Sequence, residues 1–142
     1  MSNTHILYGR GDATFQAVGK EAGVRRLVDT FYDIMQQEEA YRTIWDWHPD
    51  DIQLSRDKLF TFLCGWMGGP ARYAELYAPI NIPAAHAHLS VGVKERDMWL
   101  DCMYTAMQQL DLPKELTAYL YTQFFRPAEM IRKTSQQRSS TT

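Results

Sequence analysis

The segment from Phe62 to Met103 constrains the fold of this chain more than any other part of the sequence. One apolar helical pattern ends at Gly68–Pro70, and another begins near Val93. Between them lie roughly two dozen residues with little apolar patterning of their own, and His86 is among them. A compact domain rarely contains so long a connection unless it is functional or covers something. A large apolar ligand would fit this gap, and a histidine facing it suggests a metal at the centre of that ligand.

Length and composition indicate a single domain spanning residues 1–142. A chain of 142 residues, 45% of them hydrophobic, can bury roughly two-thirds of its surface. A formal net charge of -2 argues against nucleic acid or an anionic membrane as the main partner. The uncharged runs are too short to span a membrane. Aromatic residues make up 13% of the chain, which suits a pocket for a flat ligand, although an ordinary core explains it equally well.

The start of the chain and its cysteines lead us to expect a cytoplasmic protein. The first twelve residues lack the basic start and apolar stretch of a signal peptide. Cys64 and Cys102 lie in helical patterns among apolar neighbours, where buried free thiols are common. They form neither a CxxC pair nor a zinc spacing, so a reducing compartment is the default expectation.

Helical periodicity and the absence of strand alternation predict an all-α fold. We expect helices over about Glu21–Gln36, Leu54–Met67 and Val93–Leu110. A fourth helix should follow, with Asp111 as its N-cap and Pro113 in its first turn. We expect the N-terminal extension, residues 1–12, and the polar tail, residues 128–142, to be flexible, because segments this polar bury too little apolar surface to fold alone.

His86 is the first candidate for chemistry. A loop histidine bonded to backbone or water explains this residue at least as well, and His88 competes with it two residues later. Neither belongs to HExxH or to another zinc cluster with several ligands, which argues against a zinc enzyme. One histidine is nevertheless sufficient for haem iron, because the porphyrin supplies the in-plane ligands.

Four motifs occur in the order and spacing of one known family. They are FYDxM at Phe31–Met35, HPDD at His48–Asp51, SRDKLFxFLxGWMGGPxxY at Ser55–Tyr73 and HxHLxVGxxERDxWLxCM at His86–Met103. None is decisive alone, but together they closely resemble the group-two truncated haemoglobins over about Val24–Met107. The resemblance implies a truncated globin fold, in which a two-over-two helical sandwich surrounds haem b.

The resemblance also implies a site. His86 would be the proximal ligand of the metal, with its second ring nitrogen donating to a backbone carbonyl of the Pro83–Ser90 segment. Tyr32 and Trp99 would be the distal hydrogen-bond donors to a bound diatomic ligand. The other residues expected around the haem or its ligand are Phe31, His48, Ser55, Arg56, Lys58, Leu59, Phe62 and Met103.

Several of these positions have plainer explanations. Tyr32 and Trp99 also suit an ordinary amphipathic core. His48, which Pro49 pushes towards an extended conformation, would either approach the distal face in one state or merely cover the haem rim. Ser55, one helical turn before Leu59, is small, so ligand stabilisation would fall to the other donors.

The proximal side departs from the family pattern. Ala85 stands where a basic residue that pairs with a haem propionate is usual, and His88 and Leu89 replace the common proline and phenylalanine. These changes put propionate anchoring in doubt more than iron ligation. Lys58 and Arg56 are candidates to meet the propionates, and a solvated helix face explains both equally well.

The expected function is binding of diatomic ligands, chiefly oxygen, with nitric-oxide oxidation or peroxide chemistry on the same iron and a separate reductase as electron donor. Two or three donors around the ligand favour slow oxygen release. The alternative is a cofactor-free helical module that binds a partner helix in an apolar groove. A metal-dependent hydrolase is disfavoured, because the histidines do not cluster with carboxylates.

Overall fold

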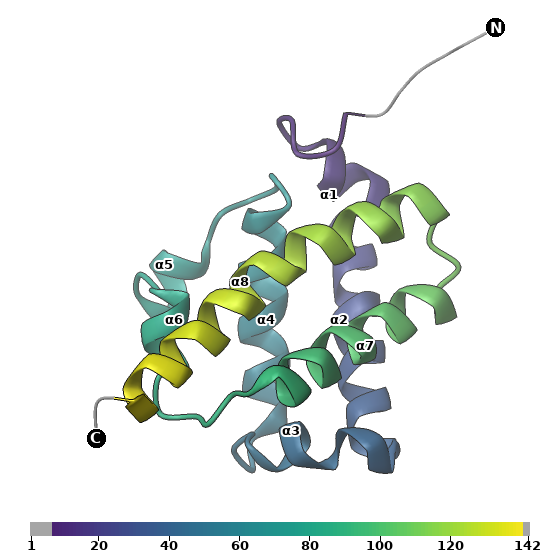
Figure 1. Cartoon of the computed structure of the whole chain (residues 1–142). Helices are drawn as coiled ribbons and strands as arrows, with labels where there is room; N and C mark the ends of the chain where they lie inside the picture. Colours follow the sequence, from purple (N-terminus) through teal and green to yellow (C-terminus); the bar gives the residue numbers. More distant parts are fainter. Residues whose placement is uncertain (1–6, 141–142) are drawn as a thin grey trace, which may run out of the picture.

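The computed structural model describes residues 7–140 and is built of helices joined by turns (Figure 1). The four long helices are α2 (Lys20–Gln37), α4 (Ile52–Trp66), α7 (Val93–Gln109) and α8 (Lys114–Ser140). The short elements are α1 (Ala13–Val18), η1 (Glu39–Tyr41), α3 (Arg42–Asp46), α5 (Tyr73–Tyr77) and α6 (Ile82–Ala85). The predicted all-α fold is therefore confirmed, and the first three predicted helices match α2, α4 and α7 closely.

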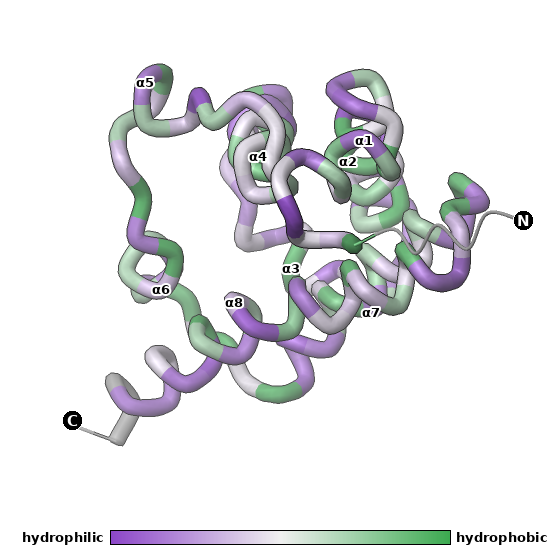
Figure 2. The backbone as a smooth tube through the Cα atoms, turned by 90° about the horizontal axis from the view of Figure 1, so that it is seen from above, coloured by the Kyte–Doolittle hydropathy of each residue, from purple (hydrophilic) through white to green (hydrophobic). Residues whose placement is uncertain are grey.

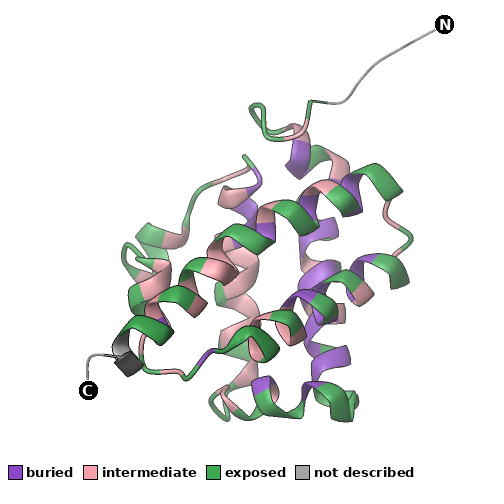
Figure 3. Cartoon of the chain, viewed as in Figure 1, coloured by how far each residue is buried: buried purple, intermediate pink, exposed green. Residues whose placement is uncertain are grey.

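The long helices form two pairs, α2 with α4 and α7 with α8, and one pair crosses the other (Figure 1). The α2 helix lies at the centre, with Val24, Leu27, Val28 and Phe31 fully buried at helical spacing. The buried residues in Figure 3 lie mainly along α2 and the inner faces of α7 and α8. Seen from above, the chain that carries α5 and α6 arches away from the packed helices α2 and α7 (Figure 2).

The ends of α4 determine where that arch begins. Asp51 caps the start of the helix, its carboxylate accepting a hydrogen bond from the Leu54 amide at 3.2 Å. At the other end Gly68 has a φ of 93°, and a Cβ at this residue would collide with the carbonyl oxygen of Gly11. The helix therefore stops as the sequence predicts, and the chain turns towards α5.

The C-terminal end of the chain differs from the prediction. The α8 helix passes through Pro127 and continues to Ser140, whereas residues 128–142 were expected to be flexible. Contacts distant in sequence explain the difference, because Ser135 is only 7% exposed and bonds to the loop after His86. Residues 141–142 lie outside the described part of the chain.

Two further expectations concern the turns that flank the helices. Asp111 has a φ of 54° and lies in the turn before α8, which begins at Lys114, so Asp111 is not its N-cap. Leu7–Asp12 form turns, and the Tyr8 ring packs 5.2 Å from that of Tyr119. The expected flexibility of residues 1–6 lies outside the described residues. Within residues 7–140, no helix is both long and apolar enough to cross a bilayer.

Candidate functional site

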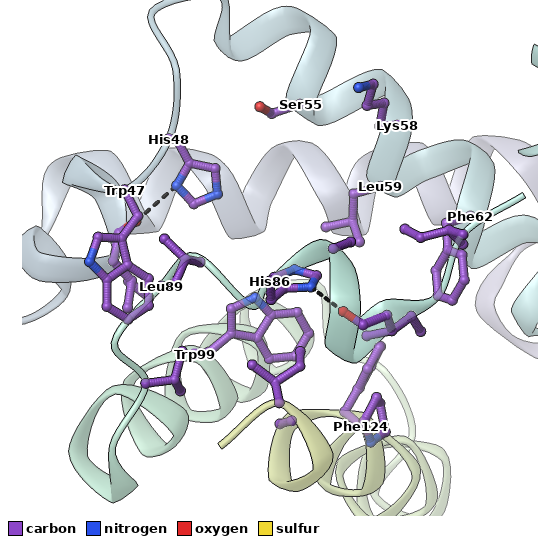
Figure 4. Close-up of a pocket in the computed structure, with 18 of the residues that line it drawn as sticks. Trp47, His48, Ser55, Lys58, Leu59, Phe62, His86, Leu89, Trp99 and Phe124 are labelled. Carbon is purple, nitrogen blue, oxygen red and sulfur yellow. Dashed lines mark hydrogen bonds between the residues drawn. The ribbon is translucent and has the colours of Figure 1, made fainter. Parts of the chain in front are cut away.

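A cavity of about 390 Å³ lies between α4, the α6 region, α7 and α8 (Figure 4). Its volume lies within the range of small-molecule and cofactor sites, and such sites are mostly apolar with a few polar groups. The predicted site residues on its wall are Tyr32, His48, Ser55, Lys58, Leu59, Phe62, His86 and Trp99. These eight residues come from three helices, α2, α4 and α7, and from two connections, and they meet around one space.

His86 follows the short helix α6 directly. Asn81 caps that helix by accepting a hydrogen bond from the Ala84 amide at 3.1 Å. The Nδ1 atom of His86 donates to the carbonyl oxygen of Ile82 at 2.7 Å. The predicted acceptor was a backbone carbonyl within Pro83–Ser90, and the observed one lies one residue earlier. Because a carbonyl only accepts, Nδ1 carries the hydrogen, and Nε2 of the neutral ring keeps a free lone pair.

Tyr32 places a hydrogen-bond donor at the cavity. Its side chain is 5% exposed, and its hydroxyl makes no hydrogen bond to another described residue. No fully enclosed side-chain oxygen or nitrogen of the described residues lacks a partner, so this hydroxyl is open to the cavity that Tyr32 lines. Burial raises the pKa of Tyr32 well above its usual value of 10, against the lowering effect of the Arg56 charge. The phenol therefore stays protonated and can donate.

Trp99 belongs to an aromatic wall. Its ring lies 5.5 Å from that of Phe124, which in turn stacks on Trp66 at 4.7 Å. Trp99 and Phe124 both line the cavity, as His86 does (Figure 4). The indole N–H makes no hydrogen bond to another residue in the described part of the chain. It is a donor with no acceptor function, so Trp99 adds a hydrogen-bond donor to an otherwise flat apolar wall.

His48 lies beside Tyr32, with the two rings perpendicular and their centroids 5.4 Å apart. Its Nδ1 donates to the carbonyl oxygen of Ile44 at 2.8 Å. Burial lowers the pKa of His48 below 6.5, and the positive charge of a protonated His86 acts in the same direction, while its backbone hydrogen bonds oppose both. Near neutral pH the ring is therefore uncharged, and its Nε2 atom can accept a hydrogen bond but cannot donate one.

The predicted wall residues on α4 are Ser55, Lys58, Leu59 and Phe62, at the spacing of successive helical turns (Figure 4). Leu63 and Trp66 of the same helix also line the cavity. The Lys58 ammonium lies 5.6 Å from the centre of the Tyr77 ring. It forms no ion pair with the described residues, so this exposed cation is available to a ligand at the cavity rim.

Three predicted residues do not line the cavity. Phe31 is fully buried behind it, with its ring 5.1 Å from both Tyr32 and Trp99, so it supports the two donors. Met103, one turn beyond Trp99, is 1% exposed and belongs to the core. Arg56 points to α2 instead, where it pairs with Asp29 at 3.2 Å and Asp33 at 2.7 Å. Two carboxylates already neutralise this guanidinium.

Other wall residues were absent from the predicted site. Trp66 and Phe124 lie in apolar helical stripes, and that pattern indicates a buried face without showing what it faces. Arg96 lines the cavity from α7 and pairs with Glu129 of α8 at 2.9 Å, which the sequence did not indicate. His88, the competitor of His86, also lines the cavity. Among the described residues, no three His, Cys, Asp or Glu side chains gather into a group that could hold a metal ion.

Comparisons with known proteins agree with this architecture. The profile of the bacterial-like globins matches residues 13–133. The group 2 truncated hemoglobin YjbI of Bacillus subtilis is 30% identical over 110 residues, which cover 78% of this chain and 80% of that protein. The group II 2-on-2 hemoglobin of Agrobacterium tumefaciens superposes with a TM-score of 0.79 and 27% identity, covering 93% of this chain and 98% of the other.

A solved truncated oxygen-avid haemoglobin from Bacillus subtilis has a TM-score of 0.74 and 28% identity, and the match covers 83% of this chain and 97% of that one. The crossed helix pairs described above are thus the two-over-two arrangement predicted from the sequence, and membership of the family implies a haem cofactor and the binding of diatomic ligands. This chain belongs to the bacterial-like globin family and is a group II truncated haemoglobin.

Proposed function

We propose that this chain holds haem b in the cavity between α4 and α8, with His86 as the iron ligand, and that dioxygen is its principal ligand. The observation that carries the proposal is the orientation of the His86 ring. Its hydrogen bond to Ile82 leaves Nε2 unprotonated, and an imidazole ligand needs that form of nitrogen. When bound, haem supplies an iron centre that takes diatomic gases and exchanges electrons.

The rest of the cavity fits the same group. Trp99, Phe124 and Trp66 provide flat apolar surfaces against which a porphyrin can pack. Lys58, exposed and without a carboxylate partner among the described residues, would meet a haem propionate at the rim. Arg56 is less suited to that role, because it already pairs with Asp29 and Asp33.

Tyr32 and Trp99 would hold the diatomic ligand. Each presents a donor that no other described residue uses, and Phe31 packs against both rings. Hydrogen bonds to a ligand that carries negative charge are stronger than those to a neutral one. Ser55 and Leu59 would complete the wall without adding a strong donor. The arrangement supports slow oxygen release, in line with the oxygen-avid character of one structural neighbour.

Nitric-oxide oxidation and peroxide chemistry are secondary proposals for the same pocket. Slow oxygen release suits redox chemistry better than bulk delivery, because the ligand stays in place until a second reactant arrives. Neither Tyr32 nor the uncharged His48 places a permanent charge at the ligand. Repeated turnover would require electrons from a separate reductase.

The direct test is reconstitution of the purified chain with haem, followed by absorption spectroscopy. We expect a Soret band, one haem per chain, and spectral changes when the reduced protein meets oxygen, carbon monoxide or nitric oxide. A colourless protein with no haem uptake would favour the cofactor-free interaction module. A rapid-mixing series with oxygen and nitric oxide would then separate storage from redox turnover.

His48 gives the pocket a predicted dependence on pH. Because its pKa lies below 6.5 and its Nδ1 already donates to Ile44, the second ring nitrogen gains a donor hydrogen only as the pH falls through that lowered pKa. We expect oxygen dissociation to slow on acidification from pH 8 to about pH 5. His48→Phe should keep haem content and lose this dependence. Stopped-flow dissociation at several pH values measures it, and parallel pH profiles in parent and variant would assign His48 to packing alone.

A further inference from the structure

The end of α8 forms one wall of the cavity. Pro127, Ala128 and Ile131 line it, next to residues of α7 and of the loop from His86 to Gly92. We call residues 127–137 the α8 extension. In Figure 1 this end of α8 lies beside α6 and the start of α7. The extension thus forms a wall of the cavity next to the loop that follows His86.

Charged groups fix the extension to α7. Glu129 accepts a hydrogen bond from Arg96 at 2.9 Å and pairs with Arg132 on its own helix at 2.8 Å. The hydrogen bonds from Arg132 and Arg96 hold the pKa of Glu129 at about 2, so the carboxylate keeps its charge throughout the neutral range. This contact positions the extension but does not touch the loop that carries His86.

Ser135 joins the extension to that loop. Its hydroxyl donates to the carbonyl oxygen of Leu89 at 3.0 Å and accepts from the amide of Val91 at 2.9 Å. Ser135 is 7% exposed and Val91 is 8% exposed, so the bond between them is buried, whereas the bond to Leu89 is partly buried. One side chain thereby satisfies a donor and an acceptor of an irregular segment more than forty residues away in sequence.

These bonds continue to His86. The Leu89 amide donates to the carbonyl oxygen of His86 at 3.0 Å, and Leu89 and Val91 both line the cavity. The ring of His86 is oriented from the other side by Ile82. The backbone of the histidine is therefore connected to α8 through Leu89 and Ser135, and its ring is connected to α6.

We infer that Ser135 is a positioning residue, which keeps the His86–Gly92 loop closed against the cavity and so slows the loss of haem. This inference rests on the proposed function. Without the hydroxyl, the buried Val91 amide would have no partner, and an unpaired buried donor is costly enough to drive the loop open towards water. A displaced loop carries the His86 backbone with it, and a metal site loses affinity when the contacts that orient its ligand are removed.

The test compares Ser135→Ala with Thr122→Ala in the purified full-length protein, with and without haem. Thr122 is a matched control, since its hydroxyl lies on the same helix but donates only to Ala118 within that helix. In Ser135→Ala we expect the Val91 amide to exchange hydrogen about tenfold faster or more. Haem transfer to an excess of acceptor apoprotein should accelerate by a similar factor. Thr122→Ala should match the parent in both measurements, and Ser135→Thr, which restores a hydroxyl, should recover protection of Val91.

The outcomes separate this inference from the proposed function. A parent protein that takes up no haem overturns the proposed function, whereas Val91 exchange in the same sample still reports on the contact with Ser135. A parent that holds haem while Ser135→Ala behaves like Thr122→Ala in exchange and haem transfer overturns the role of Ser135. If the Val91 amide exchanges faster in Ser135→Ala and Ser135→Thr does not restore its protection, the proposed role of the Ser135 hydroxyl is also wrong.

Discussion

His86→Gly is expected to reduce haem affinity more than any other single substitution in this chain, by more than about a hundredfold. The variant loses the one imidazole whose Nδ1 is already engaged with Ile82 and whose Nε2 is free to bind iron. Removing a contact that orients a metal ligand already lowers metal affinity by about ten- to a hundredfold. Removing the ligand itself should lower haem affinity by more than that. Haem titration and the absorption spectrum of the reduced protein measure the effect. Added imidazole should restore a histidine-like spectrum, because the substitution leaves space for it.

The control for this prediction is His88→Ala. His88 also lines the cavity and lies two residues away, so it tests the choice between the two histidines without moving the loop far. We expect this variant to keep haem and a spectrum of histidine-ligated iron. If His88→Ala, and not His86→Gly, loses that spectrum, the assignment of the proximal ligand is wrong.

Removing the distal donors should give the second-largest effect. We expect Tyr32→Phe and Trp99→Phe each to accelerate oxygen dissociation by about ten- to a hundredfold, because a hydrogen bond to a charged group contributes ~1.5–3 kcal/mol. Neither donor is used by another described residue, so each substitution removes no hydrogen bond within the described part of the protein. Trp99→Phe also replaces the ring that packs on Phe31 and Phe124 with a smaller one. Stopped-flow replacement of oxygen by carbon monoxide measures the rates.

The double variant tests whether Tyr32 and Trp99 act together. Phe31 packs against both rings at 5.1 Å, which links them through one side chain. The free-energy effects of residues that share a network do not add. The double variant should therefore destabilise bound oxygen by less than the sum of the two single-variant effects. Tyr41→Phe is a control for Tyr32→Phe, because it also removes one phenol hydroxyl. The Tyr41 hydroxyl bonds to Asp101, and Tyr41 does not line the cavity. Unchanged dissociation in both single variants would reduce Tyr32 and Trp99 to packing residues.

The structure also changes what each predicted cation is expected to do. Arg56 and Lys58 were equal candidates for the propionates, and they lie only two positions apart on α4. Two positions on a helix differ by more than half a turn, so one side chain faces α2 and the other faces the cavity rim. On α2, Asp29 and Asp33 pair with Arg56 and thereby hold two helices together above the Tyr32 ring. The propionate role therefore passes to Lys58 as the stronger proposal.

The sequence alone determined the helices and the family. The repeats of apolar residues that define α2, α4 and α7 are local, and so is the glycine stop after α4, which is why these elements were predicted closely. The motifs from Phe31 to Met103 further identified the truncated globin fold and selected His86, Tyr32 and Trp99. Each of these signals is contained in a short stretch of residues.

Tertiary structure decided how those elements meet. Periodicity shows that Phe31 and Met103 are buried, but only packing shows that they lie behind the cavity and not on its wall. The polar tail folds as part of α8 because Ser135 bonds to Leu89 and Val91, partners that no local pattern connects to it. A side chain's role at the site depends on which distant groups face it, and that arrangement arises only when the helix pairs cross.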